Sequence, residues 1–141
     1  MKNAAILKAR SYAAFLRGIN VGGNSMIKME DLAKEFKKLG FSNIKTVLAS
    51  GNVVFDSKET DTEAITKTIS QKLGKLLGRE ISVMVRSLDD IRMIVEPDPF
   101  KGARITATTK TFITFIPGYT KSMNRNKPTS FEDCTVLKVL D

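Results

Sequence analysis

The order of strand-like and helix-like segments between Ser11 and Ser87 limits the fold of this chain more than any other feature. Short β-rich runs are separated once by a tight turn and twice by longer amphipathic stretches, so the pattern reads strand, helix, strand, strand, helix, strand. We expect these elements over Ser11–Gly18, Lys28–Gly40, Ile44–Ser50, Asn52–Asp56, Thr60–Gly78 and Ile81–Ser87.

The two helical segments carry clear start and stop signals. In the first, Glu30 and Asp31 lie in the opening turn and Gly40 marks the end. In the second, Thr60 precedes Glu63 by three residues, the spacing of a capping box, and Gly78 ends the helix. Both segments therefore predict amphipathic helices with one apolar face.

This order predicts an α+β fold of the ferredoxin-like type, a βαββαβ unit whose antiparallel sheet carries both helices on one face. We expect this subdomain to cover residues 1–87 and a smaller second α+β subdomain to cover residues 88–141. In the latter, Leu88–Val95 is helix-like, whereas Lys110–Ile116 and Cys134–Leu140 are β-like. The second subdomain is short, so we expect either incompleteness at its C-terminus or a homo-dimer formed through exposed strand edges.

The composition excludes several functions. The 141 residues contain no histidine and only one cysteine, Cys134, which removes the commonest general base and most metal sites. We expect no cofactor, no metal, no membrane partner and no catalytic residue, and we interpret Cys134 as a semi-buried apolar side chain. The N-terminal apolar stretch is too short for a signal peptide, which favours a cytoplasmic location.

The net charge of +8 raises the alternative of a nucleic-acid-binding protein, because lysine and arginine clusters neutralise phosphates. Against this, the helical lysines fall on the outward faces of the predicted helices, where solvated charge is normal. The predicted strands also lack the interleaved aromatic side chains that stack on bases. The lysines concerned are Lys34, Lys37, Lys38, Lys67, Lys72 and Lys75.

Three loops are expected to meet at one end of the sheet. Right-handed crossovers fix the strand directions of such a sheet. The segments Arg17–Asn24, Ser50–Asn52 and Gly78–Arg79 then converge. Gly- and Asn-containing loops beside an arginine suit an anion, because backbone amides can point outward there. The candidate ligand-binding residues are Arg17, Gly18, Asn20, Gly22, Gly23, Asn24, Ser50, Gly51 and Asn52.

A purely structural interpretation of the same residues stays open. The glycines can serve only to supply positive φ in turns, Asn20 and Asn52 can cap local backbone groups, and Arg17 can form an ion pair with Glu30 or Asp31. The stretch Gly18–Asn24 matches neither the dinucleotide-binding fingerprint nor a P-loop, so no nucleotide motif is assigned.

The motifs "FLRGINVGGN", "LGF", "VLASGNVVF" and "DPF" resemble a bacterial family known as domain of unknown function 1697. The resemblance is strongest from Tyr12 to Phe100 and implies two ferredoxin-like subdomains in one chain, with no established activity. The chain departs from the family pattern by extra residues before Tyr12 and by lacking a C-terminal segment that contains asparagine and tryptophan. It has no tryptophan at all.

Four functions follow from these patterns. The first is a binding module for a phosphate-bearing or other anionic ligand, and the second is nucleic-acid binding through the basic surface. An enzyme that uses Ser50, Asp56 or Glu30 is the third, although no catalytic constellation supports it. The fourth is an assembly role through the strand edge at Lys110–Ile116.

Overall fold

The structure, a computed structural model, describes residues 8–20, 23, 26–47, 51–117 and 132–137. The chain divides into two compact units, Met1–Ile91 and Arg92–Asp141. The division falls within a helix that follows the last strand of the first unit. Each unit is described by itself below.

The first unit contains the six elements that the sequence pattern predicts, in the same order. Their bounds agree with the expected ones to within about three residues, the usual uncertainty of helix and strand ends. Along the chain, these six elements are β1 (Arg10–Arg17), α1 (Met29–Lys38), β2 (Ser42–Val47), β3 (Asn52–Ser57), α2 (Thr62–Leu77) and β4 (Ser82–Ser87). A further helix, α3 (Leu88–Val95), follows and contains the division between the two units.

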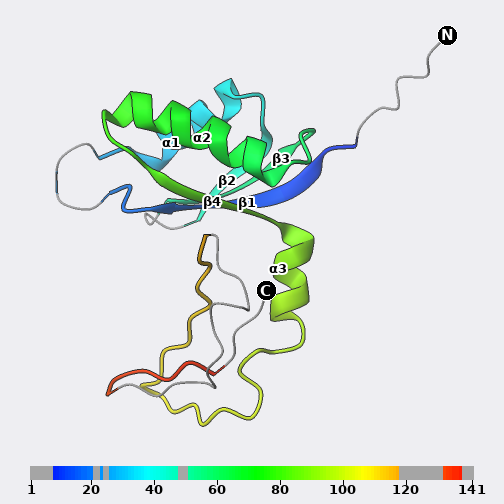
Figure 1. The fold of residues 1–141 in the computed structure, drawn as a ribbon, viewed down its shortest axis with the longest axis vertical. Coiled ribbons are helices and arrows are strands. Elements are labelled where there is room, and N and C mark those ends of the chain that lie inside the picture. Colours follow the sequence, from blue (N-terminus) through cyan, green and yellow to red (C-terminus); the bar gives the residue numbers. More distant parts are fainter. Residues whose placement is uncertain (1–7, 21–22, 24–25, 48–50, 118–131, 138–141) are drawn as a thin grey trace. The chain divides into compact units, whose positions relative to one another are not determined.

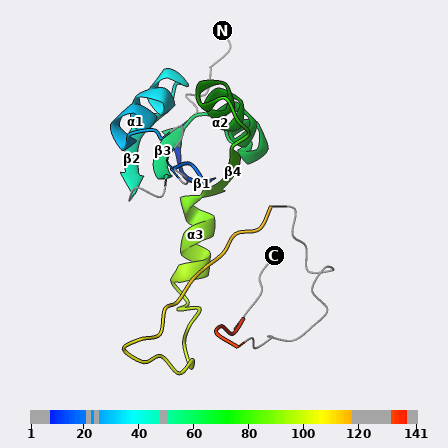
Figure 2. The same ribbon diagram turned by 90° about the vertical axis from the view of Figure 1, so that its left-hand side faces the viewer.

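The four strands form one antiparallel sheet in the order β2-β3-β1-β4. Each strand–helix–strand connection therefore skips one strand: β3 lies between β1 and β2, and β1 lies between β3 and β4. Helices α1 and α2 cover the same face of the sheet (Figures 1 and 2). The predicted α+β class, with an antiparallel sheet and both helices on one face, is confirmed.

The hydrophobic core lies between the sheet and these two helices. Alternate residues of each strand point into it, including Leu16 of β1, Phe55 of β3 and Val83 of β4. On the helix side, Leu32 and Ile69 are fully buried. The remaining strand side chains lie on the opposite side, which we call the second face of the sheet. It includes Ala13 and Arg17.

The start of α2 differs from the predicted capping box. The N-cap is Asp61, whose side chain accepts a hydrogen bond from the backbone N–H of Glu63 at 2.9 Å. Thr60 instead donates its backbone N–H to the side chain of Glu59 at 2.8 Å. A carboxylate at the N-cap accepts a hydrogen bond from a backbone N–H that has no partner within the helix, and its negative charge is stabilised by the positive end of the helix dipole. Asp61 therefore takes the capping role that the sequence pattern assigned to Thr60.

The described residues of the second unit contain little regular structure. Lys110–Ile116 was predicted as a strand, and this is wrong in the structure: the segment is irregular, and Phe112 is 75% exposed. A β-like sequence becomes a strand only beside a partner strand, and the sheet formed by the described residues consists of β1, β2, β3 and β4. Of the predicted final strand, Thr135 forms an isolated bridge, and residues 138–140 lie outside the described part.

Two further sequence-based expectations concern single features. Cys134 is exposed rather than semi-buried. None of the described helices is long and apolar enough to span a membrane.

Candidate functional site

Three loops meet at one end of the sheet, as the strand directions predict. The side chain of Arg79, just after α2, donates hydrogen bonds to the backbone carbonyl oxygens of Gly18 and Ile19, at 2.7 and 3.1 Å. Gly51, in the turn between β2 and β3, packs against the side chain of Ile19. The loop after β1 therefore contacts both other loops.

Asn20 closes this loop on itself. Its amide Nδ2 donates to the carbonyl oxygen of Ile27 at 3.0 Å, and its Oδ1 accepts from the Ile27 N–H at 2.9 Å. A single side chain thus imitates one rung of a β-ladder and joins the two ends of the loop. This geometry agrees with the structural interpretation of Asn20, in which the amide caps local backbone groups.

The glycines of the loops have the backbone conformation that the structural interpretation requires. Gly18, Gly23 and Gly51 all have positive φ, at 68°, 75° and 87°. Gly51 has a second constraint, because a Cβ atom at that position would collide with Cγ2 of Ile19. The predicted site residues Gly22, Asn24 and Ser50 lie outside the described residues.

Arg17 occupies the end of β1 and is exposed. It follows Leu16, whose side chain is in the core, so the Arg17 side chain lies on the second face of the sheet. Its register partner on β4 is Ser82, also exposed. Asn52, the first residue of β3, precedes the buried Val53 and lies on the same face at the same end.

The structural interpretation allows an ion pair between Arg17 and Glu30 or Asp31, and the described residues do not form it. Asp31 pairs with Lys34 at 2.9 Å, and Glu30 is exposed. Within the part of the chain that the structure describes, Arg17 has no ion pair. The site therefore has one guanidinium at the surface, Arg17, and one that is committed to backbone carbonyls, Arg79.

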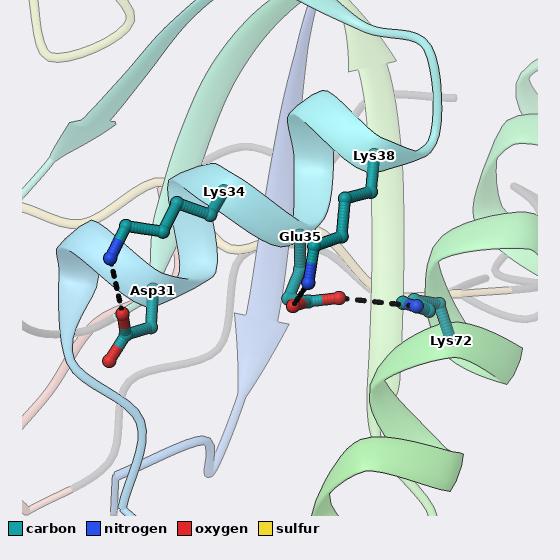
Figure 3. A network of polar contacts seen from close by, with 5 residues as sticks. All are labelled: Asp31, Lys34, Glu35, Lys38 and Lys72. Carbon is teal, nitrogen blue, oxygen red and sulfur yellow. Dashed lines mark hydrogen bonds and ion pairs between the residues drawn. The ribbon is translucent and has the colours of Figure 1, made fainter.

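The lysines of the two helices are partly neutralised by acidic neighbours. Glu35 of α1, nearly buried, receives Lys38 at 2.7 Å from its own helix and Lys72 at 3.2 Å from α2 (Figure 3). Hydrogen bonds from Lys38 and Lys72 hold the pKa of Glu35 below its ordinary value. Together with the Asp31–Lys34 pair, this network engages three of the lysines predicted on the outward helix faces.

Asp56, a catalytic candidate of the enzyme hypothesis, lies at the opposite end of β3 from Asn52. Its carboxylate accepts hydrogen bonds from Ser11 Oγ at 2.5 Å and from Asn43 Nδ2 at 2.6 Å. These two bonds, first that from Asn43, lower its pKa. Asn43 has a positive φ of 48° at a register irregularity of β2, so the cluster fixes a bulge in an edge strand.

Sequence reasoning missed three side chains that the structure makes prominent. Arg79 was placed in a converging loop, but its bonds to Gly18 and Ile19 carry no local sequence signal, because the partners are about sixty positions away. Ser82 could have been found by pairing the predicted strands β1 and β4. Glu35 could have been found from its position beside the apolar stripe of α1.

A four-stranded antiparallel sheet with two helices on one face, and with loops gathered at one end, defines a small α+β domain whose candidate site lies at that loop end. The chain belongs to a family of proteins of unknown function, DUF1697, which matches residues 9–134. None of the curated proteins matches the chain.

Two chains of solved structures match it. One is a conserved bacterial protein, SP0830 from Streptococcus pneumoniae, at 26% sequence identity and a TM-score of 0.56. The match covers 63% of this chain and 48% of the Streptococcus chain, so this chain corresponds to about half of that protein. The likeness supports the fold and names no ligand.

Proposed function

We propose that this chain is a binding protein for a small phosphate-bearing or other anionic ligand, held at the loop end of its sheet. The observation that carries the proposal is the position of Arg17. This arginine is exposed at the end of a central strand, faces Ser82 across the β1–β4 pair and has no ion pair among the described residues.

A guanidinium at this place suits an anion. Its planar, positively charged fork donates two parallel hydrogen bonds to a phosphate or a carboxylate. It is anchored on a strand, so its backbone is fixed before the ligand arrives, which lowers the entropic cost of binding.

Neighbouring groups can complete the contacts. The hydroxyl of Ser82 and the amide of Asn52 are hydrogen-bond donors on the same face and at the same end as Arg17. In this proposal Gly18, Gly23 and Gly51 shape the adjacent loops, and the amides of the Arg17–Asn24 loop and the Ser50–Asn52 turn add donors. No acid–base or nucleophilic role is assigned, and the protein acts by binding.

A second candidate, nucleic-acid binding, rests on the basic residues of the second face. Lys45 of β2 and Arg86 of β4 lie on this face together with Arg17. Their neighbours along the strands, Ile44 and Val85, point toward the helices, so Lys45 and Arg86 point to the other side. A sheet face of this kind can contact a phosphate backbone. The ion pairs of Lys34, Lys38 and Lys72 weaken the corresponding argument for the helix side.

A thermal-shift titration distinguishes the two. The ligands are inorganic phosphate, mononucleotides and short RNA and DNA oligomers, each at low and moderate salt. The proteins are the parent chain, Arg17→Ala and Lys45→Ala, where the last removes an equal charge from the same face. A ligand that binds the folded state preferentially raises Tm.

We expect a small anion to raise the Tm of the parent and of Lys45→Ala, and Arg17→Ala to bind it at least about tenfold more weakly. Binding of oligomers alone, lost with salt and reduced equally by both substitutions, would identify a diffuse polyanion surface instead. If no ligand shifts Tm, the anion-binding function is rejected.

A further inference from the structure

We propose that the anion site selects a tetrahedral oxyanion, such as a phosphate monoester, over a planar carboxylate, and that Ser82 is the residue that makes this distinction. This inference rests on the proposed function of the same site. It narrows the ligand from any small anion to one with three terminal oxygens.

Arg17 and Ser82 are neighbours across two strands of the sheet. They are register partners in the antiparallel pair of β1 and β4, so their Cβ atoms lie about 4.5–5.5 Å apart. The adjacent pair, Leu16 and Val83, points into the core, which places Arg17 and Ser82 on the second face. Both residues are exposed. The long guanidinium and the short hydroxyl can therefore reach the same ligand.

Ser82 differs from other serines of the same sheet in its hydrogen bonding. The hydroxyl of Ser11 donates to Asp56, and the hydroxyls of Ser57 and Ser87 accept backbone N–H groups. Within the part of the chain that the structure describes, the Ser82 hydroxyl forms no such bond with protein groups. It is therefore a hydrogen-bond donor that the fold itself does not use.

The number of ligand oxygens decides which anion can use both donors. A planar carboxylate has two oxygens, and the two parallel N–H groups of a guanidinium engage both of them. A phosphate monoester has three terminal oxygens, so the third lies outside the plane of the fork when the other two are bound. A hydroxyl beside the guanidinium can donate to this third oxygen. Because hydrogen bonds to ionised acceptors are the stronger ones, the extra contact favours the phosphate.

The charges around this pair set the affinity for any anion and do not choose between the two classes. Lys45 of β2 lies on the same face and attracts both. Glu80 is exposed two positions before Ser82 and repels both. Asp56 lies four residues from Asn52 along β3, about 13 Å away. Selectivity must therefore come from hydrogen-bond geometry.

Asn52 offers a second polar side chain on this face, but in a diagonal position. The register of β1 and β3 pairs Ala14 with Val53, so the next position places Asn52 beside Phe15, two residues before Arg17. Diagonal neighbours are roughly 7–8 Å apart, farther than direct partners. Asn52 should therefore contribute less to selectivity than Ser82, and it provides a matched comparison.

The experiment measures Kd for methyl phosphate and for malonate by NMR titration of the ¹⁵N-labelled full chain at pH 8. Each ligand carries about two negative charges at this pH, but malonate carries them on two planar carboxylates. The ratio of the two Kd values thus reports on oxygen geometry rather than on net charge. The variants are Ser82→Ala, Ser82→Thr, Asn52→Ala, Lys45→Ala and Arg17→Ala. None of these side chains belongs to the hydrophobic core, and Tm checks that each variant is folded.

We expect the parent to bind methyl phosphate at least about tenfold more tightly than malonate. Ser82→Ala should reduce this ratio to about threefold or less by weakening methyl phosphate, whereas Ser82→Thr, which keeps the hydroxyl, should retain it. Asn52→Ala should change the ratio less than Ser82→Ala. Lys45→Ala should weaken both ligands to the same extent and leave the ratio unchanged.

Equal affinity of the parent for the two ligands, or an unchanged ratio in Ser82→Ala, overturns the inference. The proposed function stands without it if Arg17→Ala still loses the ligands that the parent binds. An equal fall of the ratio in Lys45→Ala also overturns the inference, because the preference would then be one of charge. If the parent binds neither dianion, the proposed function fails and this inference fails with it.

Discussion

Gly51 lies against Ile19 so closely that a side chain of any size at position 51 would overlap the Cγ2 atom of Ile19. Ile19 is itself buried in the core, at 1% exposure, and cannot move aside without disturbing its neighbours. The β2–β3 turn can therefore lie this close to the loop after β1 only because residue 51 is a glycine.

The first prediction follows from this contact. Gly51→Ala combines a strained positive φ with the overlap on Ile19, so we expect a loss of roughly 2–4 kcal/mol in the free energy of unfolding. Gly40→Ala is the matched control, because Gly40 has nearly the same φ, 88° against 87°, and open space where a Cβ would lie. It should lose only about 1–2 kcal/mol. If Gly51→Ala and Gly40→Ala lose equal free energy of unfolding in urea, the overlap with Ile19 does not contribute to the loss.

The second prediction concerns the loop closed by Asn20. Asn20→Ala removes both hydrogen bonds to Ile27 and should lower the free energy of unfolding by about 1–3 kcal/mol. Asn20→Asp keeps the acceptor for the Ile27 N–H but places a carboxylate oxygen against the Ile27 carbonyl, so it should be at least as harmful at neutral pH. Asn20→Asp should recover part of its stability when the carboxyl is protonated at low pH. A pH-independent Tm difference between the parent and Asn20→Asp would contradict this account.

The third prediction concerns pH. The pKa of Glu35 is lower in the folded state than in the unfolded state because of Lys38 and Lys72. Between these two pKa values the unfolded state binds more protons, so the stability from Glu35 is complete above about pH 4.3 and is lost as pH falls through the folded pKa. Glu35→Gln should therefore lower Tm at pH 7, and its difference from the parent should shrink in acid.

Glu30→Gln provides the control for this measurement. Glu30 lies on the same helix and is exposed, and among the described residues it has no ion pair. Its substitution should change Tm little at any pH. A Tm difference for Glu35→Gln that stays constant from pH 7 to pH 3 would show that the network in Figure 3 contributes no pH-dependent stability.

The fourth prediction tests the start of α2. Asp61→Ala should cost about 1 kcal/mol, because it removes the cap on the N–H of Glu63. Thr60→Ala should be close to neutral, since the Thr60 side chain does not cap this helix. If Thr60→Ala instead loses more stability than Asp61→Ala in chemical denaturation, Thr60 is the cap, as the capping-box spacing in the sequence suggests.

The sequence was sufficient for the first unit because its information there is local. Strand and helix patterns follow from the apolar periodicity, and chirality rules place the loops after β1, β2 and α2 at one end of the sheet. The positions of Arg17 and Asn52 at that end were predicted in this way. The hydrogen bonds of Arg79 were not predicted, because a side chain that bonds to backbone far away in the sequence produces no periodic pattern in the sequence.

The prediction failed where structure depends on a partner. Lys110–Ile116 has the composition of a strand, yet a strand needs neighbouring backbone, which the sequence pattern alone does not supply. The N-cap of α2 was misplaced by one residue for a smaller reason. Thr60 and Asp61 are both good caps, and only the local backbone conformation chooses between them.

The strand order has a consequence for the way the first unit is made. β1 is synthesised before the other strands but lies in the middle of the sheet, where Tyr12 is opposite both Phe55 of β3 and Ser87 of β4. Only the β2–β3 hairpin can close locally as the chain leaves the ribosome. The apolar side chains of β1 therefore stay without their strand partners until β3 and β4 have been synthesised. The sheet can be completed only after Ser87 has emerged from the ribosome.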